Sequence, residues 1–498
     1  MSKKIGGVVA LVGLCALSLF LVNCGSSSSR PAGVLYVLTQ GNNSVGNYVS
    51  TFAMDLNSGG LSLVNSNAST CPTAATGTNS NPCGLPLDIL LDLSGATAFV
   101  LDQGAPCPEV FDTKNKVWIC DSTQNAPVAP AIYPYTVNSD GSLSAPGGAI
   151  TWSCGAASTC AYSDLGFAMS RDATGQFLFV IDQGSNPTPG YPIATVTNPS
   201  CPHVPTSPTD VCPSISVFKM SSAGLTLASG SPFYLSKIPS ALSAITFTPP
   251  NSTTLQELLF VTNNEDICSA QSCVAPSPHN DNTVSVYSVS LTGTLGTLSE
   301  QSNSPYAVAA VNPISVLAVN TSPVTQPTVG GLFVYVGNED PNGGHLYPFE
   351  VCTAVGNSNC TQPQVDQHLM FPLRTCLDVS CDIPPSTAGQ NPIAMVVDPT
   401  NKFLYVASEG SSQVFGFTIN LGAGTLTALS PNPNLPTGSH PVSMAFHPTV
   451  NNTGQFLYTS NSGSTNISGF TLSTTSGVMN ALPSPTATTT TPSGMTAR

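Results

Sequence analysis

The sequence predicts an all-β fold, a seven-bladed β-propeller closed by pairing of a C-terminal strand with the N-terminal blade. Two observations predict it. A unit of four short β-type runs recurs along the chain, which is typical of repeat architectures. Charged residues make up only 7% of the 498 residues. The chain is rich in Ser, Thr, Asn, Gly and Pro instead, and this composition favours strands and turns over helices.

The repeat is clearest in two consecutive copies near the C-terminus, at residues 391–428 and 440–479. Each copy contains four runs, here called a to d, and the b run of the first copy reads Phe-Leu-Tyr-Val. The seven b runs are residues 33–37, 96–100, 176–180, 257–261, 332–336, 402–407 and 455–459. One four-stranded sheet cannot bury both of its faces alone, so seven such sheets are expected to stack around an axis. The alternative, two separate sandwiches, is disfavoured because one repeat spans the chain.

Closure of the ring is predicted from what the first and last copies lack. The first copy begins with its b run and has no a run, whereas residues 482–488 begin a Pro-containing run that no b run follows. We therefore expect residues 482–488 to supply the inner strand of blade 1, which leaves no open sheet edge at the axis. Residues 33–490 then form the propeller, and residues 491–498 form a disordered tail.

The N-terminus predicts export. Lys3 and Lys4 precede an uncharged apolar run over residues 5–22, and Cys24 follows it. This pattern resembles a lipoprotein signal peptide, with residues 1–23 removed, Cys24 lipidated and residues 24–32 forming a Ser-rich tether. Asn23 departs from the small residue usual before such a cysteine, and an uncleaved membrane anchor is the alternative. The expected location is the cell envelope, lipid-anchored on the periplasmic or surface side, at the outer membrane if the host has one.

The remaining cysteines predict disulfides. Apart from Cys15 and Cys24 there are 14, and they form seven local doublets. The doublets are Cys71 with Cys83, Cys107 with Cys120, Cys154 with Cys160, Cys201 with Cys212, Cys268 with Cys273, Cys352 with Cys360, and Cys376 with Cys381. Local pairing within each doublet is the simplest connectivity in an oxidising compartment, although other connectivities stay open. The spacings vary and no CxxC pattern occurs, so we expect no metal site.

The net charge limits the kinds of partner that the protein can bind. The formal net charge is −14, which excludes a nucleic-acid binder that works by phosphate neutralisation. We expect a monomer that contacts the membrane through its lipid anchor. Its propeller mouth would bind a protein, a glycan or a small lactone, without a cofactor.

The cycle Pro-x-x-apolar, Phe-Leu-Tyr-Val, Val-x-Phe/Tyr and Gly-x-Leu, plainest at residues 392–427 and 441–478, carries a family resemblance. It resembles YVTN-type β-propellers and, among them, the lactonase family that includes 6-phosphogluconolactonase-like enzymes. The resemblance covers residues 33–490. It implies the propeller fold and raises the possibility of lactone hydrolysis, because related repeats serve both enzymes and binding proteins.

Lactone hydrolysis needs a base for water and donors for the developing oxyanion. The loops that leave the b runs and enter the a runs hold the candidates. Glu409 or Glu339 would be the base, with His440 and Arg171 as cationic partners. The alternative for His440, which precedes Pro441, is a turn residue.

Other polar groups leave the b runs as well. The repeated Asp-Gln-Gly at residues 102–104 and 182–184 is expected to organise a strand-to-loop turn. The acidic stretches 263–266 and 338–340 lack the twelve-residue pattern of a calcium loop, which favours solvated loops.

Two functions follow. The favoured one is a non-catalytic surface or periplasmic binding module. The alternative is a hydrolase that opens an unphosphorylated lactone, because Lys and Arg are scarce and His440-Pro441-Val442 departs from the His-Pro-Arg found in many family members. A mouth plugged by the loops at 105–131, 185–213 and 262–282 would favour the binding module. Perturbed polar groups converging on the axis would favour the enzyme.

Overall fold

The computed structural model describes residues 33–40, 47–68, 86–103, 109–112, 117–120, 130–151, 166–183, 213–222, 224–235, 237–249, 252–266, 282–308, 312–321, 331–339, 343–353, 370–372, 386–447 and 455–498. The predicted signal peptide, Cys24 and the tether lie outside these ranges. Within the ranges, no helix is long and apolar enough to cross a bilayer.

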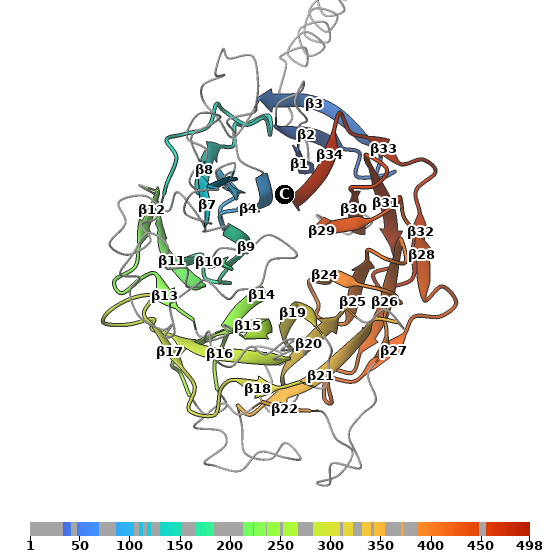
Figure 1. The fold of residues 1–498 in the computed structure, drawn as a ribbon. Helices are drawn as coiled ribbons and strands as arrows, with labels where there is room; N and C mark the ends of the chain where they lie inside the picture. The colour runs from blue at the N-terminus through green and yellow to red at the C-terminus, as the bar shows by residue number, and fades with distance from the viewer. Residues whose placement is uncertain are drawn as a thin grey trace, which may run out of the picture.

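Seven antiparallel sheets follow one another around a common axis in chain order, and Figure 1 shows the ring with β4, β9, β14, β19, β24, β29 and β34 innermost. The seven-bladed propeller predicted from the repeat is confirmed. Every predicted b run is the second strand of a blade, counted outward from the axis.

Blades 1 and 2 differ from the others. Blade 1 is ordered β3-β2-β1-β34, and blade 2 is the three-stranded sheet β4-β5-β8 with the separate hairpin β6-β7. Their strands are β1 (Val34–Gln40), β2 (Tyr48–Met54), β3 (Leu61–Ala68), β4 (Pro86–Leu91), β5 (Thr97–Asp102), β6 (Glu109–Asp112), β7 (Val117–Cys120) and β8 (Ala131–Thr136).

Blades 3 to 7 share one plan. Four strands run outward from the axis, and a short fifth strand pairs with the third one beside the outer strand. Blade 3 contains β9 (Gly166–Arg171), β10 (Phe177–Asp182), β11 (Ser214–Ser221), β12 (Gly224–Leu227) and β13 (Phe233–Tyr234). Blade 4 contains β14 (Lys237–Phe247), β15 (Gln256–Asp266), β16 (Thr283–Val289), β17 (Leu298–Glu300) and β18 (Tyr306–Ala307).

Blade 5 contains β19 (Pro313–Asn320), β20 (Leu332–Asn338), β21 (His345–Val351), β22 (Met370–Pro372) and β23 (Ser386–Thr387). Blade 6 contains β24 (Pro392–Val397), β25 (Phe403–Ser408), β26 (Gln413–Ile419), β27 (Leu426–Ala428) and β28 (Asn434–Pro436). Blade 7 contains β29 (Pro441–His447), β30 (Gln455–Asn461), β31 (Asn466–Leu472), β32 (Met479–Ala481) and β33 (Thr486–Ala487).

The ring closes through β34 (Thr491–Ala497), which pairs antiparallel with β1, Val37 opposite Met495. Closure by a C-terminal strand is therefore confirmed, but the predicted segment was wrong. Residues 486–487 form β33 on the outside of blade 7, paired with β31. Residues 491–498, expected to be a disordered tail, instead form the inner strand of blade 1.

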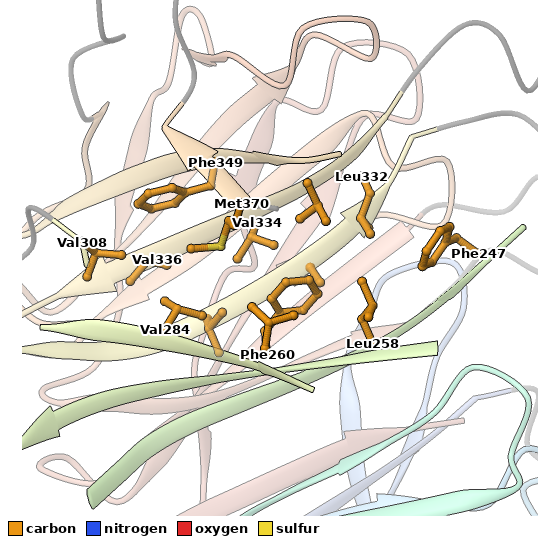
Figure 2. Close-up of a cluster of buried hydrophobic side chains, with 14 residues drawn as sticks. Phe247, Leu258, Phe260, Val284, Val308, Leu332, Val334, Val336, Phe349 and Met370 are labelled. Atoms are coloured by element: carbon orange, nitrogen blue, oxygen red, sulfur yellow. The ribbon is translucent and has the colours of Figure 1, made fainter. Parts of the chain in front are cut away.

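Apolar cores lie between the blades. Seven buried clusters occur, and each combines side chains of two neighbouring blades, including one that joins blade 7 to blade 1. Figure 2 shows the cluster between blades 4 and 5, where Phe260 and Leu258 face Leu332 and Val334. The b strands are buried on both faces because each is covered by a blade on either side, so they read as continuous apolar runs.

The Tyr of the repeat locks neighbouring blades together. Tyr405 of blade 6 donates its hydroxyl to the carbonyl oxygen of Gly477 in blade 7, at 2.8 Å. The same bond joins Tyr36 to Gly141, Tyr335 to Gly424 and Tyr458 to Gly59. The last of these bonds links blade 7 to blade 1. Gly477 has φ 70° and lies against the ring of Phe403, where a Cβ atom would clash. The Phe-Leu-Tyr run and the Gly of the next blade are thus one interlocking unit.

We expect Tyr405→Phe to lower the free energy of unfolding by about 1–2 kcal/mol, because the Gly477 carbonyl loses its partner inside the protein. The measurement is the urea midpoint. Tyr48→Phe, at a half-buried residue of β2, is the control and should change the free energy of unfolding by less than about 0.5 kcal/mol. If both variants lower the free energy of unfolding equally, the hydrogen bond from Tyr405 to Gly477 does not stabilise the contact between blades 6 and 7.

Candidate functional site

One face of the ring gathers the ends of the b strands and the beginnings of the a strands. In blades 2, 5, 6 and 7 the Pro that begins the a strand pairs with the last residue of the b strand, followed by a β-bulge. On this face the b strands carry a ring of buried polar residues, Thr39, Asp102, Asp182, Asn263, Asn338, Ser408 and Asn461. This face, called the mouth below, is the one that the sequence predicted to carry function.

Three blades build the mouth with the same turn. Asn312, Asn391 and His440 each precede the first Pro of an a strand and have φ between 46° and 52°. Their carbonyl oxygens accept the backbone N–H of Glu339, Glu409 and Ser462, each at 2.9 Å. His440 therefore has the structural role of a turn residue. The predicted acids Glu339 and Glu409 occupy equivalent positions in the adjacent blades 5 and 6.

Glu409 begins a turn that reaches blade 7. Ser412 donates its N–H to the Glu409 carbonyl at 3.2 Å, and its hydroxyl oxygen accepts the N–H of His440 at 3.4 Å. The hydroxyl of Ser411 accepts the N–H of Gln390 at 2.7 Å. Each hydroxyl uses its oxygen as an acceptor in these bonds, so each retains a proton to donate. The mouth of blades 6 and 7 thus presents a carboxylate, an imidazole and two hydroxyl donors.

Arg171 does not belong to this group. It is the last residue of β9, opposite Leu178, whereas the mouth end of that strand is Gly166, opposite Asp182. Six residues of strand separate the two ends by roughly 17 Å. Its guanidinium donates to the carbonyl oxygen of Asp172 at the far face of blade 3. The expectation that Arg171 assists Glu409 and His440 was therefore wrong, because an a strand carries its last residue away from the mouth.

The glutamine of the second Asp-Gln-Gly motif joins two blades. Gln183 donates its side-chain amide to the carbonyl oxygen of Pro239 in the next blade at 2.9 Å. Gln40, in the equivalent place after β1, does the same to Pro86 at 3.2 Å. Gly104 and Gly184 lie outside the described residues, so the predicted turn stays a prediction.

The acidic stretch 263–266 was expected to be a solvated loop, but it forms the end of β15, where it pairs with β14. Asn338, the first residue of the second stretch, ends β20. Asn263 donates to the hydroxyls of Thr283 and Ser285, and the side-chain oxygen of Asn338 accepts the N–H of His345. Across the described ranges, no group of three or more His, Cys, Asp or Glu side chains could hold a metal ion.

The predicted disulfides fall mostly outside the described residues. Cys352 is fully buried just after β21 and is disulfide-bonded, and Cys120 ends β7. The other cysteines of the seven doublets lie outside the described ranges, and so the seven local pairings stay a prediction. These cysteines are Cys71, Cys83, Cys107, Cys154, Cys160, Cys201, Cys212, Cys268, Cys273, Cys360, Cys376 and Cys381.

The three loops expected to cover the mouth, at 105–131, 185–213 and 262–282, also lie mostly outside the described residues. Whether they plug the mouth therefore stays a prediction.

The sequence did not single out the serines of the mouth. Ser411 and Ser412 directly follow Glu409-Gly410, and a hydroxyl next to a candidate base was the available signal. Ser412 has φ 52°, a backbone conformation that sequence alone does not reveal.

Comparison with known proteins supports the fold. Residues 381–496 match the family described as lactonase, 7-bladed beta-propeller, and this segment includes Glu409 and His440. No curated protein matches the sequence.

Solved structures resemble the whole ring. A Bacteroides fragilis protein provisionally described as a 6-phosphogluconolactonase has a TM-score of 0.53 at 13% identity, over 95% of this chain and 99% of that one. A counterpart from Bacteroides uniformis has a TM-score of 0.51 at 12% identity, over 94% and 99%. A periplasmic gluconolactonase from Pseudomonas aeruginosa has a TM-score of 0.50 at 14% identity, over 93% and 98%.

At such low sequence identity, the similarity to these solved structures supports the fold and no particular activity. The ring of blades, its closure by β34 and the match over residues 381–496 make the chain a seven-bladed β-propeller that resembles the lactonase family.

Proposed function

We propose that the protein hydrolyses a lactone at the mouth of blades 6 and 7. The observation that carries the proposal is the turn that links Glu409, Ser411, Ser412 and His440, because it lies within the segment that matches the lactonase family. Ester hydrolysis requires a base and hydrogen-bond donors. Glu409 would serve as the base, and the hydroxyls of Ser411 and Ser412, in the same turn, would serve as the donors.

The proposed reaction begins when the Glu409 carboxylate takes a proton from water and the water oxygen bonds to the lactone carbonyl carbon. The hydroxyls of Ser411 and Ser412 donate to the resulting oxyanion. The bond from that carbon to the ring oxygen then breaks, and the ring oxygen takes the proton back from Glu409. Lactone and water give one hydroxy acid, so atoms and charge balance without a metal or a cofactor.

The substrate is proposed to be unphosphorylated. A phosphate group is usually held by Arg or Lys, and the whole chain has 11 such residues. Arg171, the guanidinium that the sequence placed at the mouth, lies at the opposite face. The name of the Pseudomonas aeruginosa protein of similar fold, a periplasmic gluconolactonase, makes a sugar lactone the natural first substrate to test.

The place of action is proposed to be the cell envelope. The apolar run before Cys24 supports export and lipid anchoring of the chain. Seven local disulfides are proposed on the pairing of neighbouring cysteines, and the disulfide-bonded Cys352 supports an oxidising compartment.

The test is hydrolysis of D-glucono-δ-lactone by the purified protein and three variants. Glu409→Gln should lower kcat/KM by about 10²–10⁴-fold, the usual contribution of a general base. His440→Asn keeps a residue that blades 5 and 6 use at the same turn, so a loss of activity in that variant reports on the imidazole. Arg171→Ala, at the far face, should leave kcat/KM unchanged.

Hydrolysis that survives Glu409→Gln and His440→Asn would remove this site. If neither D-glucono-δ-lactone nor other lactones are hydrolysed, the non-catalytic binding module becomes the better hypothesis.

A further inference from the structure

Blades 4 and 7 contain equivalent grooves. The groove of blade 4 has a volume of about 250 Å³ and is lined by residues of β13 in blade 3 and of β16 and β17. Figure 1 labels these three strands. The groove of blade 7, of about 360 Å³, lies between the segment after β28 and β31 and β32. Strand register matches Asn263 to Asn461 and Ser285 to Ser468.

The shared residues of the two grooves are structural. The side-chain amide of Asn263 donates to Thr283 and Ser285 at 3.2 and 3.0 Å. The amide of Asn461 donates to Asn466 and Ser468 at 2.8 and 2.9 Å. In blade 6, Phe415 takes the place of this serine and packs against Gly389. In blades 4 and 7 a serine therefore lies beside the groove, whereas in blade 6 an aromatic ring stands at the same position.

The groove of blade 4 differs from that of blade 7 in three residues. By register, Lys237, Tyr287 and Glu300 stand where blade 7 has Ser439, Phe470 and Ala481. The strand framework does not depend on these groups, because blade 7 pairs its strands in the same register with Ser439, Phe470 and Ala481. Charged residues make up only 7% of this chain, so a cation and an anion lining one groove are a local departure from its composition.

The positions of the charged groups suit a ligand of both signs. Lys237 is half-buried at the start of β14, and Glu300 is exposed at the end of β17. Ser304 donates its hydroxyl to one oxygen of Glu300 at 2.8 Å. Glu300 stands opposite Tyr287 in the pairing of β16 with β17. Burial and then the Glu300 charge raise the pKa of the Tyr287 phenol. Phe233, Leu235 and Leu298 add apolar walls.

We propose that the groove of blade 4 binds a small zwitterion, an α-amino acid with an apolar side chain. The carboxylate of the ligand faces Lys237, its ammonium group faces Glu300 and the Tyr287 hydroxyl, and its side chain packs on Phe233 and Leu298. A ligand with a net charge meets a group of its own sign in the same groove and binds less well. This site is separate from the mouth and does not depend on lactone hydrolysis.

Calorimetric titration of the full-length protein tests this proposal with three probes of one shape. L-leucine carries both charges, isoamylamine lacks the carboxylate and 4-methylpentanoate lacks the ammonium group. Leucine should bind at least about tenfold more tightly than either analogue, the effect of one well-placed charged contact. Lys237→Met should abolish the preference for leucine over isoamylamine and keep the preference over 4-methylpentanoate. Glu300→Gln should have the reciprocal effect.

Ser439→Ala, in the groove of blade 7, is the matched control and should leave all three affinities unchanged. Tyr287→Phe gives blade 4 the phenyl ring that Phe470 supplies at the equivalent position of blade 7. This variant should bind leucine more weakly and unfold at the same thermal midpoint as the wild type. The proposal is wrong if leucine gives no saturable heat, or if its preference over both analogues is the same in Lys237→Met and Glu300→Gln.

Discussion

Deletion of residues 491–498 is expected to abolish cooperative folding of the protein. The deletion removes β34, so β1 loses its inner neighbour and blade 1 loses its a strand. Met495, only 4% exposed between blades 1 and 7, alone contributes about 2–5 kcal/mol by the usual cost of emptying such a site. With the lost strand pairing, the total is on the order of the whole stability of a typical domain. The measurement is the thermal transition by circular dichroism.

Met495→Ala is the point variant for the same claim and should lower the free energy of unfolding by about 2–5 kcal/mol. Thr486→Ala, in the outer strand β33, is the control, with an expected loss below about 1 kcal/mol. If the deletion leaves the thermal midpoint in place, or if Thr486→Ala costs as much as Met495→Ala, the ring is not closed by residues 491–497.

Replacement of Glu257 by Gln is expected to stabilise the protein at neutral pH. Glu257 begins the buried part of β15 at 1% exposure, and among the described residues neither carboxylate oxygen has a hydrogen-bond partner. Burial, with a smaller contribution from the charge of Asp172, raises its pKa to about 9. The native state therefore holds a proton that the unfolded chain releases near pH 4.5.

The sign of the pH dependence follows from this shift. The stability due to Glu257 is fully present below about pH 4.5 and is lost as the pH rises towards 9, at about 1.4 kcal/mol per pH unit. Glu257→Gln keeps the shape of the protonated acid. It should raise the free energy of unfolding by about 3 kcal/mol at pH 7 and have little effect at pH 4.

Urea unfolding at pH 4, 7 and 9 measures this dependence. Glu339→Gln, at an exposed residue of the mouth, should leave the pH profile unchanged. A Glu257→Gln variant that follows the wild-type profile across all three pH values would show that Glu257 is already ionised in the native state.

The blades could be predicted because each strand is specified by a short stretch of sequence. Each b run is a short apolar segment bounded by turn residues, and the Phe-Leu-Tyr run of one blade meets the Gly turn of the next through the bond from Tyr405 to Gly477. A repeat of this kind can be read without knowing how distant segments pair.

The closing strand was misplaced because the repeat contains two Pro-rich segments per copy. Residues 482–488 correspond to the outer connection that holds β28 in blade 6, not to an a strand. The inner strands of blades 6, 7 and 1 share Pro-x-x-Met, beginning at Pro392, Pro441 and Pro492. The Pro-x-x-Met motif could have identified the closing strand. It was overlooked because Ser493 and Gly494, the two residues between Pro492 and Met495, are not typical of a strand.

The candidate site was predicted in part. Glu409 and His440 were correctly placed at the mouth, because strand ends and strand starts meet at one face of a propeller. Arg171 was misassigned because position within an a run decides which face a residue reaches. The hydroxyl donors Ser411 and Ser412 were missed although they directly follow Glu409-Gly410, because their bonds depend on a backbone geometry that the sequence does not reveal.

Hydrogen–deuterium exchange of the intact protein tests the closed ring most directly. The account predicts that the amides of Met495 and Arg498, which donate to Ser443 and Val34, exchange as slowly as the amides of β1 and are released only with the whole propeller. Rapid exchange over residues 491–498, while β1 remains protected, would contradict closure by this strand.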